Sequence, residues 1–287
     1  MLKKISYFIF YLLYLLDRMV LIFFKRSYLI FFKDFFEKKS YQEVKISGKK
    51  LKFFVPNELT QWRVRTFYEK EPETLEWIDS FDNKDNKIFW DIGANIGLYS
   101  IYNAVKNQNI SSVSFEPSTS NLRVLSRNIS INNLQDKIKI FPISLTDKEN
   151  SFLKLREGNF IEGGALNTFG EDYNFEGKKF ENEMSYKVFG TTIQFLLKNE
   201  ILEIPDYIKI DVDGIEHLIL YGAKEFLNNR KIKSLSVEIN ENFKNHYKNI
   251  VKIMADAEFK ILQKKRSKAF IVKGSKFENT YNYIFIR

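Results

Sequence analysis

The sequence predicts an α/β fold, in which strands alternate with helices around a central sheet. Three short strand-like segments, residues 88–90, 112–115 and Tyr207–Ile210, are each followed directly by an acidic residue. Segments with a helical pattern lie between them, as in βαβ units. Because ligands of open α/β sheets bind at the carboxyl ends of the strands, these acids are predicted to lie at a ligand site.

Residues 1–40 differ in composition from the rest of the chain. They hold twelve of its 46 aromatic residues, and their eight basic and three acidic residues give +5 of the total charge of +9. Lys4, Arg18 and Lys25 recur at heptad spacing and form a basic stripe on an otherwise apolar helix. We expect this helical segment either to lie in a membrane interface with its cations toward anionic head groups or to pack against the catalytic domain or a partner subunit.

The longest uninterrupted apolar run in this segment, residues 5–16, is too short to span a bilayer and is followed by Asp17 and Arg18. The start of the chain also fits a signal peptide, but no small-residue cleavage site follows the run. The sequence therefore predicts peripheral membrane association in place of a membrane span.

Residues 41–82 are expected to form a second small region. The alternation of residues 43–56 around the turn at 47–50 predicts a β-hairpin. Residues 59–81 are predicted to be helical, with Pro72 at the start of a new turn. The remaining residues, 83–287, form the predicted ligand-binding domain.

A strand, a tight turn and a helix N-terminus are predicted in succession over residues 88–97 and Leu98–Lys106. Gly93 and Gly97 allow positive φ and a close approach of the backbone to a ligand. Asn95 lies where a third glycine is often found, and asparagine tolerates positive φ better than other side chains. This arrangement can hold a nucleotide-like ligand, although plain α/β scaffolding also uses it.

Asp91 distinguishes between two cofactors. It precedes the first glycine of this turn by two residues. A carboxylate there repels a pyrophosphate but accepts a hydrogen bond from an ammonium group. The pattern therefore favours S-adenosylmethionine over a nicotinamide dinucleotide.

A second acid supports nucleoside binding. Glu116 follows its strand nineteen residues after Gly97, the spacing at which an acid binds both ribose hydroxyls. Pro117 then ends the strand. After a predicted helix at 120–131 and a strand at 137–142, the loop that begins with Ser144 and Leu145 is placed to contact an adenine.

Residues 156–190 interrupt the α/β alternation, with five glycines between residues 158 and 177. A loop of this length in a compact domain is commonly a lid or a binding element, whereas a disordered insertion or a surface hairpin is the simpler alternative. We assign its core, residues 162–168, to recognition of the methyl acceptor.

The residues expected to carry the chemistry follow the Tyr207–Ile210 strand. Asp211 lies at its carboxyl end, Asp213 lies in the following turn, and Glu238 lies near the end of the next strand. One of these carboxylates can remove a proton from an acceptor hydroxyl. Asp211 and Glu238 can alternatively bind Mg²⁺. Glu216 is more simply explained as a helix cap.

These motifs together resemble the FkbM-type methyltransferases, and the likeness runs from about Glu71 to Asn240. It implies a class I, Rossmann-like fold with seven mostly parallel strands and helices on both faces. It also implies O-methylation of a saccharide or secondary-metabolite hydroxyl, and it places Glu71 at the cofactor entrance. The family usually has glutamate where this chain has Asp213. With the motifs above, the expected cofactor-binding residues are Glu71, Asp91, Gly93, Ala94, Asn95, Gly97, Glu116, Pro117, Ser144, Leu145 and Asp211.

Composition excludes several kinds of chemistry. The chain has no cysteine, which excludes disulfides and a thiol nucleophile. His217 and His246 are its only histidines, so a multi-histidine metal site is excluded as well.

We expect an S-adenosylmethionine-dependent O-methyltransferase of a saccharide or lipid-linked glycan, cytoplasmic and peripheral on the inner membrane face, and no nucleic-acid partner. A methyltransferase of nucleic acid or protein, or a non-catalytic membrane scaffold, is the alternative.

Overall fold

The computed structural model describes residues 1–181, 184–267 and 273–287, and divides the chain into two compact units, Met1–Tyr41 and Gln42–Arg287. The first unit contains two helices, α1 (Leu2–Phe24) and α2 (Leu29–Lys39). The predicted ligand-binding motifs all lie in the second unit.

Helix α1 is longer than the apolar run that the sequence shows. It continues through Asp17 and Arg18 and reaches 23 residues, so the expectation that this segment is too short to span a bilayer is wrong on length. Among the described residues it is the one helix long and apolar enough to cross a membrane, and only 6% of its most apolar window is buried.

A seven-stranded sheet forms the centre of the second unit, in the order β12-β13-β11-β10-β3-β4-β5. All neighbouring strands pair in parallel except at β13, which is antiparallel to both of its neighbours. The predicted seven-stranded, mostly parallel sheet is therefore confirmed. Its strands are β3 (Lys87–Ile92), β4 (Ile110–Phe115), β5 (Ile138–Phe141), β10 (Tyr207–Ile210), β11 (Ser234–Asn240), β12 (Lys260–Lys265) and β13 (Thr280–Ile286).

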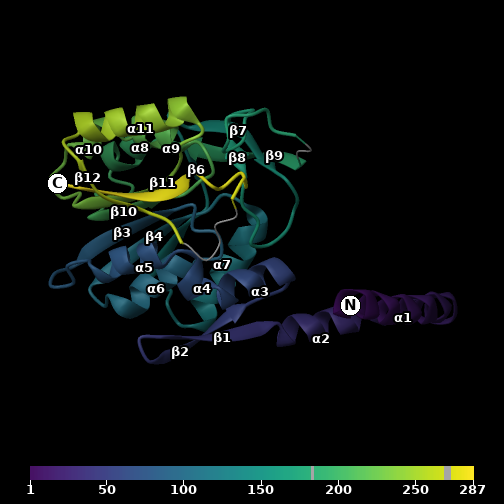
Figure 1. Ribbon diagram of the computed structural model, residues 1–287. Helices are drawn as coiled ribbons and strands as arrows, with labels where there is room; N and C mark the ends of the chain where they lie inside the picture. The colour runs from purple at the N-terminus through teal and green to yellow at the C-terminus, as the bar shows by residue number, and fades with distance from the viewer. Residues whose placement is uncertain (182–183, 268–272) are drawn as a thin grey trace. The chain divides into compact units, whose positions relative to one another are not determined.

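Helices cover both faces of this sheet (Figure 1). One face carries α5 (Pro72–Asp79), α6 (Leu98–Lys106) and α7 (Thr119–Ile131), and the other carries α8 (Ile193–Lys198), α9 (Glu216–Tyr221), α10 (Lys224–Leu227) and α11 (Lys244–Asp256). The core between these layers is apolar and fully buried at Trp90, Ile208 and Leu235. Burial on both faces explains why the strands read as apolar runs.

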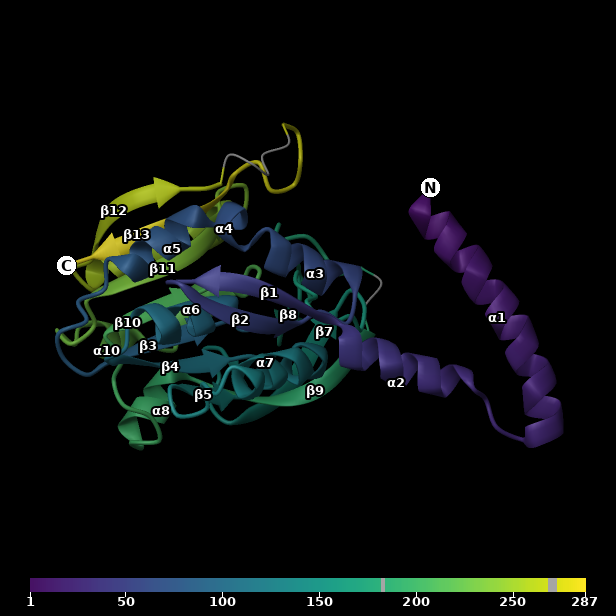
Figure 2. The ribbon, with the colours of Figure 1, turned by 90° about the horizontal axis from the view of Figure 1, so that it is seen from below.

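The region before the sheet contains the expected hairpin, β1 (Tyr41–Ile46) and β2 (Lys49–Phe54), beside α7 (Figure 2). The helix expected over residues 59–81 is instead three helices, α3 (Glu58–Arg65), α4 (Phe67–Lys70) and α5. The break before α5 has a local cause, because Pro72 cannot donate the hydrogen bond that would continue α4.

The expected long loop at 156–190 is wrong at its two ends and at β8 (Thr168–Phe169), and the rest of its described residues form no helix or strand. Its ends belong to β7 (Ser151–Glu157) and β9 (Met184–Thr191), which pair antiparallel in a four-stranded sheet with β6 (Ser144–Leu145) and β8. Residues 182 and 183 lie outside the described residues. The basic cluster at 264–268 begins on β12, and Lys268 lies outside the described residues.

Candidate functional site

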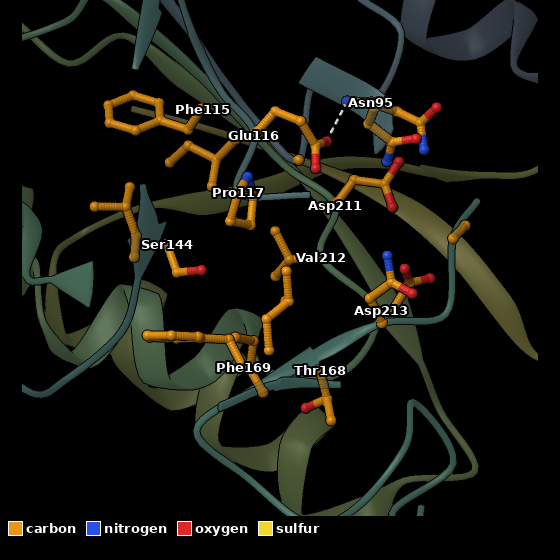
Figure 3. A pocket seen from close by; sticks show the side chains of 18 of the residues that line it. Asn95, Phe115, Glu116, Pro117, Ser144, Thr168, Phe169, Asp211, Val212 and Asp213 are labelled. Atoms are coloured by element: carbon orange, nitrogen blue, oxygen red, sulfur yellow. Dashed lines mark hydrogen bonds between the residues drawn. The ribbon is translucent and has the colours of Figure 1, made fainter. Parts of the chain in front are cut away.

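A pocket with an empty volume of about 580 Å³ lies at the carboxyl ends of β3, β4 and β10 (Figure 3). Apolar side chains such as Phe115 and Ile219 form its walls, and the carboxyl groups of Glu116, Asp211 and Asp213 are part of its lining. Seven of the eleven residues expected to bind the cofactor line this pocket: Gly93, Asn95, Glu116, Pro117, Ser144, Leu145 and Asp211.

The β3–α6 turn approaches the β10–α9 turn too closely for any side chain at Gly93. A Cβ atom built at Gly93 would lie 1.9 Å from the carbonyl oxygen of Asp211, and the φ of Gly93 is +86°. Asn95 also has a positive φ, of 52°. The glycine signal in the sequence therefore reflects a close backbone contact that shapes the pocket floor.

Glu116 is positioned by backbone amides at the end of β4. Its Oε2 accepts a hydrogen bond from Asn95 N at 2.7 Å (Figure 3). Its Oε1 accepts one from Ser118 N at 2.9 Å. Burial raises the pKa of Glu116 to about 7, against the lowering effect of these hydrogen bonds. The carboxyl group is thus fixed in orientation while it faces the pocket.

Asp91 lies behind the pocket. Its side chain is fully buried, and its Oδ2 accepts hydrogen bonds from the backbone N of Ser100 at 3.1 Å and from the Ser100 hydroxyl at 2.7 Å. Its Oδ1 has no hydrogen-bond partner in the structure. Asp91 is not among the lining residues, so its predicted contact with an ammonium group stays a prediction.

The segment at residues 161–169 crosses the pocket and is held there by polar contacts from several elements. The side-chain amides of Asn95 and Asn121 both donate to the carbonyl of Gly164, at 2.7 and 3.1 Å. Arg63 Nε donates to the carbonyl of Gly163 at 2.6 Å, and Gly163 N donates to Asn121 Oδ1 at 2.9 Å. We call this segment the strap, and it lines the predicted cofactor pocket through Gly164, Ala165, Asn167, Thr168 and Phe169. Its predicted role in acceptor recognition stays a prediction.

A buried lysine lies between the carboxylates of the site. Lys209 Nζ is 2.6 Å from Asp211 Oδ2 and 4.8 Å from the centre of the Tyr99 ring. Although burial alone would lower it, the charges of Asp211, Glu71 and Asp91 raise the pKa of Lys209. For Glu71 the effects are reversed. Burial alone would raise its pKa, but the charges of Lys70 and Lys209 lower it to about 2.

Lys209 was not predicted, although a signal was available. It is the one charged residue in the four-residue strand Tyr207–Ile210, all of which is buried. A lysine is almost never fully buried without a partner. Its position inside a buried strand therefore indicates a nearby acid.

Asp211, Asp213 and Glu238 come together as predicted from their spacing. One carboxylate oxygen from each lies within 4.8 Å of the others, and such a group could hold a metal ion. Burial and the charges of Asp211 and Glu216 raise the pKa of Asp213 to about 7. Burial and the charges of Asp211 and Asp213 also raise the pKa of Glu238 well above its usual value. We call these three residues the acidic rim.

Glu216 and the two histidines serve the architecture of this region. The carboxylate of Glu216 accepts hydrogen bonds from the backbone N atoms of Val212 and Gly214, at 3.1 and 3.0 Å, and contacts His246 Nε2 at 2.6 Å. Burial and the charge of His246 lower the pKa of His217 to about 4. Glu216 therefore supports the turn that carries Asp213. The expectation that it caps a helix is wrong, because α9 begins at Glu216 itself and has no side-chain cap.

The remaining expected contacts lie at three places. Ser144 and Leu145 form β6 beside the pocket, and the buried Ser144 hydroxyl has no hydrogen-bond partner in the structure. Gly97 is the N-cap of α6, and Ala94 is buried in the preceding turn. Glu71, Ala94, Gly97 and Asp91 do not line the pocket.

A family model described as the methyltransferase FkbM domain matches residues 91–261, more than half of the chain. The chain belongs to the FkbM methyltransferase family. Methyltransferase sdnD of Sordaria araneosa is 27% identical over 180 residues, which cover 55% of this chain and 69% of that protein. This FkbM methyltransferase is thus an S-adenosylmethionine-dependent enzyme, and the pocket is its candidate cofactor site.

Two solved structures similar to this FkbM methyltransferase are more distant. Methyltransferase FkbM from Methylobacillus flagellatus KT is 13% identical with a TM-score of 0.49, and the match covers 80% of this chain but only 52% of that structure. TrmK from M. capricolum, solved with S-adenosyl-homocysteine, is 15% identical with a TM-score of 0.41, and the match covers 74% of this chain and 66% of that one.

Proposed function

We propose that this enzyme transfers the methyl group of S-adenosylmethionine to a hydroxyl of a saccharide or lipid-linked glycan. The observation that carries this proposal is the acidic rim, Asp211, Asp213 and Glu238, beside the pocket at the carboxyl ends of the strands. Several carboxylates on one rim suit an acceptor that presents hydroxyl groups, because carboxylates accept hydrogen bonds from them. The glycan acceptor itself is what the family resemblance implies.

The cofactor is proposed to lie in the pocket with its ribose at Glu116 and its adenine between Pro117 and Leu145. The backbone amides of Asn95 and Ser118 hold the Glu116 carboxyl group so that free lone pairs remain for two ribose hydroxyls. The unpaired Ser144 hydroxyl supplies a polar contact for a base edge. The methionine end then points toward Asp211.

The reaction in this arrangement is an in-line displacement at the methyl carbon. The acceptor oxygen forms a bond to that carbon as the carbon–sulfur bond breaks, and the acceptor proton passes to a carboxylate of the rim. Asp213, with a pKa of about 7, and Glu238, with a pKa raised well above its usual value by burial, are suited to take up that proton. Lys209 holds Asp211 in place through its 2.6 Å contact.

The rim also fits a divalent cation, because three carboxylate oxygens lie close together and Mg²⁺ prefers oxygen ligands. Asp211 and Glu238 would hold it. When bound, the ion would lower the pKa of an acceptor hydroxyl. The ammonium group of Lys209 already neutralises part of the charge of Asp211. The proposed proton transfer therefore does not require a metal ion, and the assay below compares Mg²⁺ with EDTA.

The test is a methyl-transfer assay with labelled S-adenosylmethionine and a panel of saccharides and lipid-linked glycans, with Mg²⁺ and with EDTA. We expect label in a glycan fraction, in an ether that survives mild base. Label found only in RNA, DNA or protein would overturn the glycan assignment. Nucleic acid is the second candidate acceptor, because the chain carries a net charge of +9. Residues 1–40 contribute +5 of that charge, so the domain that holds the pocket is only weakly basic.

We also propose that the enzyme acts on the cytoplasmic face of the cell membrane, where lipid-linked acceptors are held. The apolar and basic composition of residues 1–40 supports this location. Fractionation of cells that express the full chain tests it. The enzyme is expected in the membrane pellet, and recovery in the soluble fraction at low salt would contradict the location.

A further inference from the structure

We infer that α1 and α2 form a helical hairpin, closed by Asp17, that inserts α1 into a bilayer with an anionic surface. The inference concerns residues Met1–Tyr41 only and does not depend on the acceptor. It goes beyond a peripheral location, because it assigns the lipid-binding surface and a residue that shapes it.

Asp17 is the only acidic residue of α1, and it is satisfied inside the hairpin. Its carboxylate accepts hydrogen bonds from the Ser27 hydroxyl at 2.8 Å and from the backbone N atoms of Tyr28 and Leu29 at 2.7 and 3.3 Å. The Tyr28 hydroxyl donates to the carbonyl of Leu13 at 2.6 Å. Asp17 therefore caps the N-terminus of α2, whose own N-cap residue makes no side-chain cap.

This closure removes the main obstacle to burying α1 in hydrocarbon. An unpaired carboxylate in lipid is costly, whereas one that binds several donors costs much less. Asp17 is only 5% exposed, and it is the one buried residue of α1. The helix therefore presents its apolar side chains outward while its acid faces the turn.

Lipid fits the surface of α1 better than a protein groove does. A helix that docks on a protein buries one apolar stripe and keeps a polar face. Exposed apolar side chains instead cover most of α1; they include Phe8, Ile9, Phe10, Tyr11, Leu12 and Leu16. Its exposed basic residues lie toward its two ends, Lys3 and Lys4 at the first turn and Arg18 near the turn to α2. At about 1.5 Å per residue, its 23 residues extend about 34 Å, which is close to the thickness of the hydrocarbon layer.

The charges of the hairpin indicate an anionic surface. Lys25 and Arg26 lie in the turn, and Lys33, Lys38 and Lys39 lie on α2. With Asp17 enclosed, Asp34 and Glu37 are the acids that remain in residues 1–40. Basic residues near a membrane surface strengthen binding to anionic lipid and lose that effect at high salt.

Vesicle sedimentation of the full chain tests the surface. We expect binding to vesicles of phosphatidylcholine with phosphatidylglycerol, and binding about tenfold weaker to pure phosphatidylcholine. Leu16→Glu is expected to abolish binding, whereas Leu262→Glu, on β12 and equally exposed at 59% against 55%, leaves it unchanged. Binding of S-adenosylhomocysteine should be equal in all three proteins, which separates this result from the cofactor proposal.

Trypsin tests the role of Asp17, because Lys25 and Arg26 are cleavage sites in the turn that it closes. Asp17→Ala should be cut there about tenfold faster than the unchanged chain, because the turn loses the hydrogen bonds that close it. The substitution makes α1 more apolar, so faster cleavage cannot come from weaker burial of the helix. Asp34→Ala removes the same charge from an exposed position and should be cut at the unchanged rate. Equal cleavage of both variants would remove Asp17 from the account. The membrane proposal would be overturned if the full chain formed a stable dimer that binds none of the vesicles. It would also be overturned if mass spectrometry of the intact expressed protein showed that α1 had been removed.

Discussion

Lys209 compensates a group of buried acids that would otherwise repel one another. It contacts Asp211 directly, and its charge acts on Glu71 and Asp91. Removing one partner of a buried charge group leaves the others without compensation, which commonly costs more than the pair contributes. The site is therefore sensitive to this lysine although it is not placed to touch the methyl group.

Lys209→Met is expected to lower the free energy of unfolding by about 3–5 kcal/mol. Adding Glu71→Gln to it should restore part of the loss, because one uncompensated acid is removed. Urea unfolding of the two single variants and the double variant measures the coupling. Additive losses would show that Lys209 and Glu71 act independently.

Asp211→Asn should reduce methyl transfer by about 10²–10⁴-fold while S-adenosylhomocysteine still binds. The amide keeps the shape of the side chain but loses the charge that pairs with Lys209 and accepts hydrogen bonds from the acceptor. Single-turnover kinetics beside calorimetric binding measure the two effects separately. Asp256→Asn, an exposed change at the end of α11, is the control, and normal turnover in Asp211→Asn would remove Asp211 from the mechanism.

At the scale of elements, the strap joins parts of the chain that are far apart in sequence. Asn121 on α7 contacts both Gly163 and Gly164, and Leu166 N donates to Asp213 Oδ2 at 2.6 Å. Leu166 and Asp213 both have φ near +64°, which is costly for leucine and more readily adopted by aspartate. The strap thus links the cofactor pocket to the acidic rim.

Asn121→Ala is expected to weaken S-adenosylhomocysteine binding about tenfold, because the strap loses two hydrogen bonds that hold it over the pocket. Asn132→Ala, at the C-cap of the same helix, loses contacts to β2 and not to the strap. Calorimetric titration of both variants distinguishes them. Equal affinities would show that the strap does not cover the cofactor.

At the scale of the whole molecule, acids with raised pKa make the folded state depend on pH. The pKa values of Glu116 and Asp213 are about 7 in the folded protein, against 4.5 and 3.8 in the unfolded chain. The folded state therefore binds more protons between these limits, so stability is greatest below about pH 4 for these groups and falls as pH rises toward 7. Other groups add their own dependence.

The corresponding variants should flatten that pH dependence. The new side chains in Glu116→Gln and Asp213→Asn cannot ionise. Between pH 4 and pH 7.5 the free energy of unfolding of each variant is therefore expected to fall by about 3 kcal/mol less than that of the unchanged enzyme. Thermal unfolding of the cofactor-free enzyme across this range measures it. An unchanged slope in Glu116→Gln would contradict a raised pKa at that residue.

The sequence predicted the sheet well because its strands are buried on both faces and end in polar turns. Residues 207–210 and Leu98–Lys106 were bounded correctly by an acid and a glycine. It predicted α1 and the strap less well. The Asp17 carboxylate meets α2, and Asn121 meets Gly164, only after folding, and such contacts leave no local pattern in the sequence.

The most direct test of the cofactor site is calorimetric titration of S-adenosylhomocysteine into the unchanged enzyme and into Glu116→Ala and Asp91→Ala, with NAD as the parallel ligand. We expect micromolar binding to the unchanged enzyme, no binding of NAD, and affinity reduced by about 10–100-fold in Glu116→Ala. Asp91→Ala should also bind weakly. Unchanged affinity in both folded variants would contradict the placement of the cofactor in this pocket.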